Sequence, residues 1–521
     1  MREHNEDISN EENDNEDDEQ KPFSNFRDSK VNENKCKKIT TIILSIILLL
    51  IPIGIIIYLI YVFISNDNTP DNLNELSLIY QVNNLFNKVK IYDISSSNIT
   101  TSIISMTIND TKITPTNEYK FNSTGMYNIK IKIKDDLLSI DSLFKNCDNL
   151  IEADFSKFNM GKITNISHLF YGCSSLTNIT GLSLNKESKV DDISFLFYGC
   201  SSLSSINLNN FYTSNVVNME GLFDSCISLS SINLNNFDTS KVTSMSKMFN
   251  KCVSLISLDL NKFNTKNVVD FSSIFNSCYN LTNINLDNFD TSRVKSMNQM
   301  FRDCTSLTSI NLNHFKTEQV EDIYQMFSGC RSLETLDIDN FNTSKITNMY
   351  KLFYDCSSLI SINVDSFDTS NVITMSAMFS QCSSLSSLDL TNFNFSTTVY
   401  MDNMFSGCSS LNYVIFNENL EYNNINMINY IDNMFKSCEN LESINFGTLN
   451  MSLVMNMSGL FENCNLLSSI DFSYFDSSNV ESFDNVFEGI SFNGEIIYNS
   501  SIFNETILDE LPYNWSRIDI K

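Results

Sequence analysis

The chain has 521 residues and a formal net charge of −28, from 34 Lys and Arg against 62 Asp and Glu. This balance argues against a nucleic-acid-binding surface, because neutralising phosphates requires clustered cations. With 13 glycines, 5 prolines and 3 histidines, the chain is poorly supplied with residues for phosphate loops, Pro-rich linkers and His-based metal cages.

The N-terminal segment, residues 1–38, is acidic up to residue 34, with twelve acidic residues against four basic ones. Such a composition cannot bury a core, so we expect a disordered cytosolic tail. Cys36 lies between lysines at the end of this tail and is a candidate for palmitoylation. An unmodified thiol is the alternative.

Residues 39–64 contain no charged residue, and about 20 apolar residues suffice to cross a hydrocarbon core of about 30 Å. We expect a transmembrane signal-anchor helix here, rather than a buried core helix or a cleaved signal peptide. Lys37 and Lys38 directly precede the segment, whereas the first cation after it is Lys88. The positive-inside rule then predicts a single-pass type II protein of the plasma membrane, with the N-terminus cytosolic and the remainder extracellular. The lumen of an internal membrane is the alternative location.

Three further segments flank the main body of the chain. Residues 65–95 are expected to form a juxtamembrane stalk with helical character around residues 76–89. Residues 96–140 are expected to form a small β-rich N-terminal cap, because the alternation over residues 127–133 predicts a strand. Residues 491–521 lose the periodicity of the preceding sequence and are expected to form a C-terminal cap.

Thirteen cysteines recur along the main body, at steps of 26 residues apart from one step of 27 and one of 30. A fixed period of this size indicates a solenoid. Because Ile490 fills the next cysteine position, we predict that these are buried packing positions rather than disulfides or zinc ligands. The cysteines are Cys147, Cys173, Cys200, Cys226, Cys252, Cys278, Cys304, Cys330, Cys356, Cys382, Cys408, Cys438 and Cys464.

The repeat that begins at Cys226 illustrates the unit. Leu229, Ile232 and Leu234 give the spacing of a half-buried strand. The following Asp-Thr-Ser offers the side-chain oxygens that cap a helix N-terminus. The apolar residues that come 16, 19, 23 and 26 positions after Cys226 then lie on one face of a helix.

Each unit therefore predicts a strand, a turn and a helix. A single unit buries too little apolar surface to offset its conformational entropy, so the units must stack. The expected fold is an α/β solenoid of leucine-rich-repeat type over residues 141–490, with about 14 repeats of 26 residues and a parallel strand and a helix in each.

The repeat motif resembles that of the BspA-like leucine-rich-repeat surface proteins of bacteria, mycoplasmas and protists. It reads Met-Phe-x-x-Cys-x-Ser-Leu-x-Ser-Ile-Asn-Leu-x-x-Phe-Asp-Thr-Ser-x-Val-x-x-Met and is complete over residues 223–245, with Leu222 in place of the first Met. The resemblance covers roughly residues 140–490 and implies a cell-surface adhesion or recognition protein. The chain departs from bacterial members in its internal signal-anchor and its lack of a lipoprotein cleavage site.

In a leucine-rich-repeat solenoid the outward strand residues line one face, here the residues five and seven positions after each cysteine. They are mostly Ser, Asn and Asp, which suit a glycan or a basic protein surface. A solvated face without a ligand is the alternative, because the columns lack Tyr, Trp and Arg anchors. The candidate ligand-binding residues on this face are Asn233, Asp259, Asn285, Asp337 and Asp389.

A second candidate surface surrounds the 30-residue step between Cys408 and Cys438. Four tyrosines cluster there in sequence, and an irregular aromatic loop on a rigid scaffold is a reasonable binding site. A bulge without function is the alternative. The tyrosines are Tyr400, Tyr413, Tyr422 and Tyr430.

Thirteen N-x-S/T sequons lie beyond residue 64, about as many as chance gives in a chain rich in Asn, Ser and Thr. If the host glycosylates, this part of the chain is the one modified. Candidate glycosylation sites include Asn98, Asn122, Asn280, Asn394 and Asn504.

No Ser/His/Asp triad motif, P-loop, H-E-x-x-H or EF-hand occurs, so we expect neither an enzyme nor a cofactor or metal site. The expected function is that of a membrane-anchored surface protein that binds protein or glycan ligands through its solenoid. The alternative is a structural coat protein that self-associates laterally without a dedicated ligand.

Overall fold

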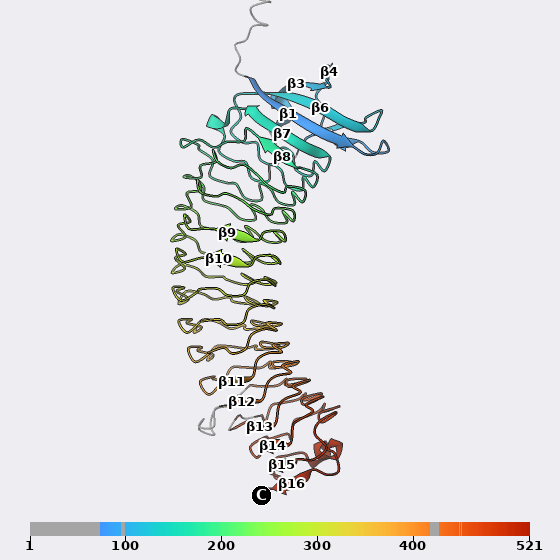
Figure 1. Ribbon diagram of the computed structural model, residues 1–521, viewed down its shortest axis with the longest axis vertical. Helices are drawn as coiled ribbons and strands as arrows, with labels where there is room; N and C mark the ends of the chain where they lie inside the picture. The colour runs from blue at the N-terminus through green and yellow to red at the C-terminus, as the bar shows by residue number, and fades with distance from the viewer. Residues whose placement is uncertain (1–72, 95–98, 417–426, 448, 450) are drawn as a thin grey trace, which may run out of the picture. The chain divides into compact units, whose positions relative to one another are not determined.

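The computed structural model describes residues 73–94, 99–416, 427–447, 449 and 451–521. Within residues 73–521 the chain winds into coils that stack in chain order below a β-sheet (Figure 1). The elements are β1 Leu73–Val82, β2 Val89–Lys90, α2 Ile99–Ser102, β3 Ile103–Ile108, β4 Thr111–Ile113, β5 Glu118–Tyr119, β6 Gly125–Lys134, β7 Leu150–Lys157, η1 Met160–Lys162, β8 Asn178–Thr180, β9 Ser257–Asp259, β10 Asn283–Asn285, β11 Ser387–Asp389, β12 Tyr413–Ile415, β13 Ser443–Asn445, β14 Ser469–Phe472, β15 Glu495–Tyr498, η2 Glu505–Glu510 and β16 Ser516–Asp519.

The N-terminal cap is a six-stranded sheet in the order β4-β3-β6-β1-β7-β8. Its pairs are antiparallel up to β7, and the parallel pair of β7 with β8 begins the solenoid. β6 confirms the strand predicted from the alternation over residues 127–133. The helical character expected around residues 76–89 is wrong, because β1 occupies residues 73–82 and buries every second side chain, including Leu76, Leu78 and Tyr80.

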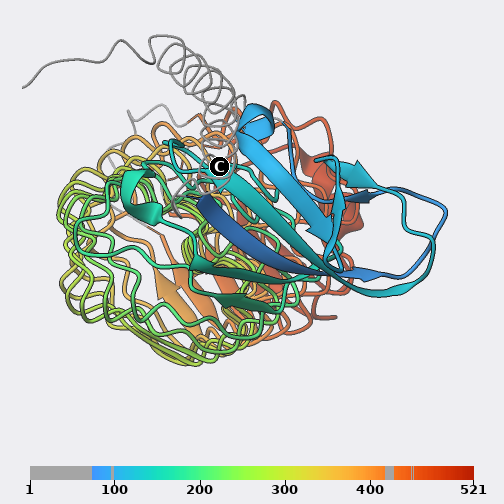
Figure 2. The ribbon, with the colours of Figure 1, turned by 90° about the horizontal axis from the view of Figure 1, so that it is seen from above.

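The coils stack through short strands that pair in parallel at identical repeat positions. In the pair of β9 with β10, Asn283, Ile284 and Asn285 lie beside Ser257, Leu258 and Asp259. The central residue of each strand points inward and its two neighbours point to solvent. Seen from above, the coils lie over one another (Figure 2).

The expected α/β solenoid is wrong, because the segment assigned to a helix in each repeat is a run of turns. The molecule is a β-solenoid of about 13 turns. The N–H groups of Lys247 and Phe249 donate to carbonyl oxygens of the next coil, at 2.8 Å and 2.9 Å. Those of Met248 and Asn250 donate three residues back within their own coil. Alternate N–H groups therefore donate to the neighbouring coil, so the continuous series of hydrogen bonds of an α-helix cannot form.

Two residues in this segment of each coil have positive φ, for example Lys247 and Lys251, both at 57°. A non-glycine residue at positive φ is unusual, since its Cβ approaches the following carbonyl. The hydrogen bonds between coils stabilise this conformation. The apolar side chains at Val242, Met245 and Phe249 still point inward, because three-residue turns return the chain to the same face.

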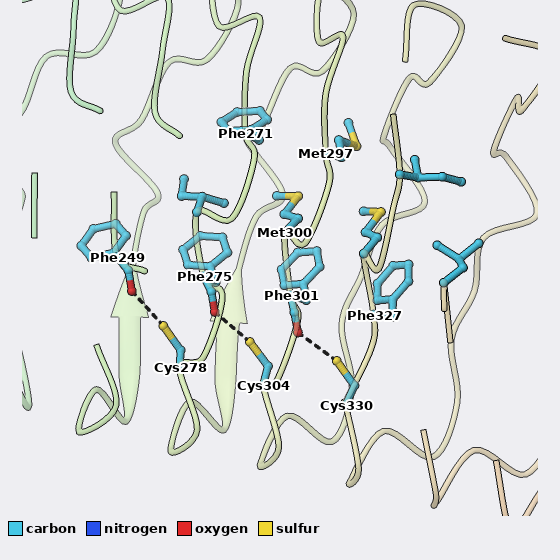
Figure 3. Close-up of a cluster of buried hydrophobic side chains, with 14 of the residues drawn as sticks. Phe249, Phe271, Phe275, Cys278, Met297, Met300, Phe301, Cys304, Phe327 and Cys330 are labelled. Carbon is cyan, nitrogen blue, oxygen red and sulfur yellow. Dashed lines mark hydrogen bonds between the residues drawn. The ribbon is translucent and has the colours of Figure 1, made fainter. Parts of the chain in front are cut away.

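The core contains a stack of phenylalanine rings, one from each coil, from Phe144 to Phe487. Phe275 and Phe301 are typical, with ring centroids 5.7 Å apart and ring planes 18° from parallel. Figure 3 shows this row beside the cysteines and methionines of the same coils. Thirteen cysteines are buried free thiols, which confirms their prediction as packing positions.

A column of buried threonines joins neighbouring coils on another side of the core. The hydroxyl of Thr239 donates to the carbonyl oxygen of Asn264 at 3.0 Å, and the N–H of Asn264 donates to the same hydroxyl at 2.7 Å. Thr291 and Thr343 make the corresponding bond to the following coil. The Asp-Thr-Ser sequence expected to cap a helix thus provides contacts between coils.

Among the described residues, no helix is long and apolar enough to cross a membrane. The longest helical element there, η2, has six residues, whereas a span needs about 20. The expected span at residues 39–64 and the lipidation candidate Cys36 lie outside the described residues. The described residues do not support the expected single-pass type II protein, integral membrane partner or plasma-membrane location with a cytosolic N-terminus.

Candidate functional site

The residues five and seven positions after each cysteine form an exposed surface, which we call the ladder face. Asn283 and Asn285 of β10 are exposed on this face, with the buried Ile284 between them. Because the strands are in parallel register, each ladder-face residue lies beside its equivalent in the next coil. The structure thus places the sequence-predicted strand residues on one continuous side of the stack.

The seventh-position residues also shape the backbone. The Oδ1 atom of Asn285 accepts the N–H of Asp287 at 2.9 Å, and Oδ1 of Asp389 accepts the N–H of Thr391 at the same distance. This turn ends the strand. One side-chain oxygen of each of these Asn and Asp residues is therefore occupied, and the amide of Asn233 also donates to Oδ1 of Asn209 at 3.4 Å. The same turn is made by Asn233, Asp259 and Asp337.

The ladder face continues onto the N-terminal cap. Asp154 of β7 lies beside Thr180 of β8 on one side and Ser77 of β1 on the other. Ser77 in turn lies beside Lys130 of β6. The ladder face therefore extends onto the antiparallel sheet of the cap, which the repeat period alone did not reveal.

A cavity of about 690 Å³ opens in the ladder face next to this junction, and we call it the Ser183 hollow. It lies in the repeat with the 27-residue step, where Gly181 has φ of +70° and takes the position of the usual buried leucine. A Cβ atom on Gly181 would lie 2.2 Å from the backbone nitrogen of Ser156. The close approach of β8 to β7 therefore requires glycine at this position.

The lining of the Ser183 hollow is rich in hydroxyl and amide groups. Ser183, Ser205, Asn207, Asn210 and Thr180 provide both donors and acceptors. The apolar residues Ile179, Leu182 and Ile206 also line it. The sequence signals for this site are the 27-residue step between Cys173 and Cys200 and the glycine at the position of the usual leucine.

A smaller depression of about 230 Å³ adjoins the Ser183 hollow, and the two share Asn178 and Thr180. It is lined by Glu152 and Asp154, which add negative charge. Hydrogen bonds from Ser156 hold the pKa of Asp154 below its ordinary value, and the hydroxyl of Thr180 also donates to Asp154 at 3.0 Å. Asp154 is therefore a charged acceptor at neutral pH. The two recesses together offer a polar site with an acidic end.

The four candidate tyrosines do not form one cluster in the part of the chain that the structure describes. Tyr400 and Tyr430 stack with ring centroids 5.2 Å apart, at the bridge that joins their two coils. Tyr413 is half exposed and lies on the ladder face in β12. Tyr422 lies outside the described residues.

The other candidate residues are dispersed. Asn122 and Asn280 are exposed. Asn394 and Asn504 use their side-chain oxygens to accept N–H groups of Ser396 and Thr506. Asn98 lies outside the described residues. Within the described residues, no group of three or more His, Cys, Asp or Glu side chains could hold a metal ion.

The repeat sequence matches the family described as "Mycoplasma protein of unknown function, DUF285" over residues 138–255, 173–279, 253–336, 327–431 and 429–505. The chain belongs to the DUF285 family. A second model, "BspA type Leucine rich repeat region (6 copies)", matches residues 80–189 of this DUF285 protein. The resemblance to BspA-like repeats is therefore confirmed, whereas the single-pass membrane form is not supported.

Two solved structures are similar to this DUF285 chain. A leucine-rich repeat protein from Bacteroides ovatus ATCC 8483 shares 19% identity with a TM-score of 0.45, over 81% of this chain and 91% of that one. The TLR13–ssRNA13 complex shares 15% identity with a TM-score of 0.24, over 68% and 54%. Both TM-scores are low, so we infer no function from either. No curated protein matches the chain.

Proposed function

We propose that this DUF285 protein is a recognition protein whose ladder face binds a basic segment of another protein, with the Ser183 hollow as the main contact. The Ser183 hollow carries the proposal, because it is a recess of about 690 Å³ lined mainly by residues with hydroxyl and amide groups. An extended peptide offers main-chain groups that pair with such a lining.

The charge of the protein supports a basic ligand. The formal net charge of −28 favours association with cations through long-range attraction. Locally, Glu152 and Asp154 lie at one end of the recess, and Asp259, Asp337 and Asp389 lie further along the ladder face. A Lys or Arg side chain beside the hollow would meet carboxylates without displacing the turn hydrogen bonds, which use one oxygen only.

The test is binding of the full-length protein to arrays of peptides of graded net charge and, in parallel, to glycan arrays. We expect saturable binding to basic peptides that weakens as salt is added. Binding to neutral glycans alone, or no saturable binding on either array, would contradict the proposal.

A matched pair of substitutions locates the site. Ser205 and Ser361 are both exposed and both lie five positions after a cysteine, but only Ser205 lines the hollow. Ser205→Trp should fill the recess and weaken peptide binding about tenfold or more, whereas Ser361→Trp should leave it unchanged. Equal effects of the two substitutions would contradict the location.

A further inference from the structure

A strip of apolar side chains lies exposed on the side of the solenoid where Tyr400 and Tyr430 stack. Ile373, Tyr400, Met427 and Met455 are 47%, 43%, 46% and 38% exposed. We call these four residues with the half-buried Val399 and Tyr430 the outer strip. Contiguous exposed apolar surface of this kind marks an interaction site.

The outer strip is continuous because the backbone joins its coils. The N–H groups of Val399 and Tyr400 donate to the carbonyl oxygen of Ile373, at 2.9 Å and 3.3 Å. The N–H of Tyr430 donates to the carbonyl oxygen of Val399 at 3.3 Å. The N–H of Met455 reaches the preceding coil through Asn429, at 3.0 Å. Val399 therefore lies beside Ile373, and Tyr430 lies beside Tyr400, whereas the polar Asn429 lies between Val399 and Met455.

Most other coils carry polar or charged residues at the positions of Ile373 and Tyr400. Lys295 with Ser296, and Glu321 with Asp322, occupy the same two positions in two earlier coils. Parallel bridges between neighbouring coils show that Ser296 and Asp322 occupy the repeat position that Tyr400 occupies. Stacking of the coils thus does not require apolar residues at these two repeat positions. The apolar side chains of the outer strip are therefore not explained by stacking alone.

Opposite charges lie at the two ends of the outer strip. Lys345 is exposed in the coil before that of Ile373, and Glu481 is exposed in the coil after that of Met455. The N–H of Glu481 donates to the carbonyl oxygen of Met455 at 2.9 Å, so the backbone of Glu481 directly adjoins the strip. Nζ of Lys345 donates to Oε1 of Gln319 at 2.8 Å, in the coil on the side away from Ile373, so the dimer contact would have to redirect this exposed side chain.

This arrangement is self-complementary about a point between Tyr400 and Tyr430. If a second copy packs antiparallel on the same strip, the coil of Tyr400 faces the coil of Tyr430, and Ile373 faces Met455. Lys345 of each copy then lies at the coil level of Glu481 of the other, with Lys345 15 positions after Cys330 and Glu481 17 positions after Cys464. A two-fold interface requires one patch to match itself in this way. A parallel arrangement would instead place Lys345 beside Lys345 and Glu481 beside Glu481.

We propose that the outer strip is the contact surface of an antiparallel homodimer. The apolar side chains would lose their contact with water, and the two Lys345–Glu481 pairs would fix the direction and register. The ladder face is not part of this contact, so ligand binding and dimerisation can be tested separately.

The first test is sedimentation velocity of the full-length protein over a range of concentrations. The unsubstituted protein should dimerise. Ile373→Lys should weaken dimerisation about tenfold or more, because it places a cation within the apolar contact. Val217→Lys is the matched control, because Val217 is 40% exposed at the equivalent position of a coil outside the strip. A protein that stays monomeric, or a dimer that Ile373→Lys does not weaken, would overturn the proposal.

The second test is a charge exchange, which distinguishes specific charge pairing from non-specific association of apolar surfaces. Lys345→Glu and Glu481→Lys should each weaken the dimer, since each places like charges opposite one another. The double variant should restore dimerisation, because the pairs are re-formed with their signs reversed. If the double variant dimerises no better than the single variants, the antiparallel register is wrong.

Discussion

The Sγ atom of Cys278 donates a hydrogen bond to the carbonyl oxygen of Phe249, one coil earlier in the chain, over 3.1 Å (Figure 3). The same carbonyl oxygen accepts the N–H of Cys252 at 3.1 Å. Each cysteine thus fills the core and also satisfies a carbonyl of the preceding coil. The bond is repeated at the equivalent cysteines with distances of 3.0–3.3 Å, from Cys173 to Cys464.

These thiols should be unreactive in the folded protein. Burial raises the pKa of Cys278 and Cys408 to about 12, which lowers the thiolate fraction at neutral pH about 1,000-fold relative to an ordinary thiol of pKa about 9. Iodoacetamide at neutral pH should therefore label none of the thirteen repeat cysteines until denaturant is added. Mass spectrometry of native and denatured samples checks this, and native labelling at several repeat cysteines would refute it.

The phenylalanine stack should contribute strongly to stability. Phe301 is fully buried between Phe275 and Phe327, with centroid distances of 5.7 Å on both sides. Phe301→Ala should lower the free energy of unfolding by about 3–5 kcal/mol, because it removes a ring from a core that cannot fully collapse. Urea unfolding measures the change. Phe86→Ala is the control, because Phe86 is 92% exposed and its loss should cost about 0.5 kcal/mol or less.

The same urea measurement can contradict the role of the phenylalanine stack. If Phe301→Ala and Phe86→Ala lower the free energy of unfolding equally, the ring stack does not stabilise the coils.

Three aspartates should make the protein less stable in acid. Hydrogen bonds from Ser240, Ser292 and Ser370 hold the pKa of Asp238, Asp290 and Asp368 below its ordinary value. Their contribution to stability is present above the unfolded-state pKa of about 3.9 and is lost as the pH falls through the folded-state values.

The triple variant Asp238→Asn, Asp290→Asn and Asp368→Asn tests this pH dependence. Asparagine keeps an oxygen to accept the N–H two residues later but does not titrate in this range. The urea midpoint of the variant should fall less between neutral and acidic pH than that of the unsubstituted protein. Equal falls would show that these carboxylates do not contribute to the pH dependence.

Gly181→Ala should destabilise the coil that contains the Ser183 hollow. The substitution adds a Cβ at φ of +70° and places it against the backbone of Ser156, so the cost should be about 1 kcal/mol or more. Hydrogen exchange in β8 should become faster. Gly161→Ala is the control, because its Cβ would meet only the side chain of Asn159, at 3.0 Å. Unchanged exchange in β8 would contradict the role given to Gly181.

The period, the buried columns and the parallel strands could be predicted from the sequence, since side-chain burial repeats with the coil. The helix could not be rejected in the same way. Val242, Met245 and Phe249 have the spacing of a helix face, and turns that step back three residues satisfy the same spacing. The positive φ of Lys247 and Lys251 gave no sequence signal, because lysine does not favour that region.

The candidate site was predictable only in part. The exposed columns follow from strand alternation, so Asn285 and Asp389 were placed correctly on the ladder face. The Ser183 hollow depends on the approach of Gly181 to Ser156 in another coil, which the sequence of one repeat does not show. The stacking of Tyr400 on Tyr430 likewise depends on how the coils with the 30-residue step align, which the sequence does not show.

The most direct test of the structure is the far-ultraviolet circular dichroism of the full-length protein. Coils joined by backbone hydrogen bonds to their neighbours, with turns between short strands, predict a spectrum without the strong double minimum of α-helices. A spectrum dominated by that double minimum would indicate a helix in each repeat and would contradict the β-solenoid on which the ladder face, the Ser183 hollow and the outer strip all depend.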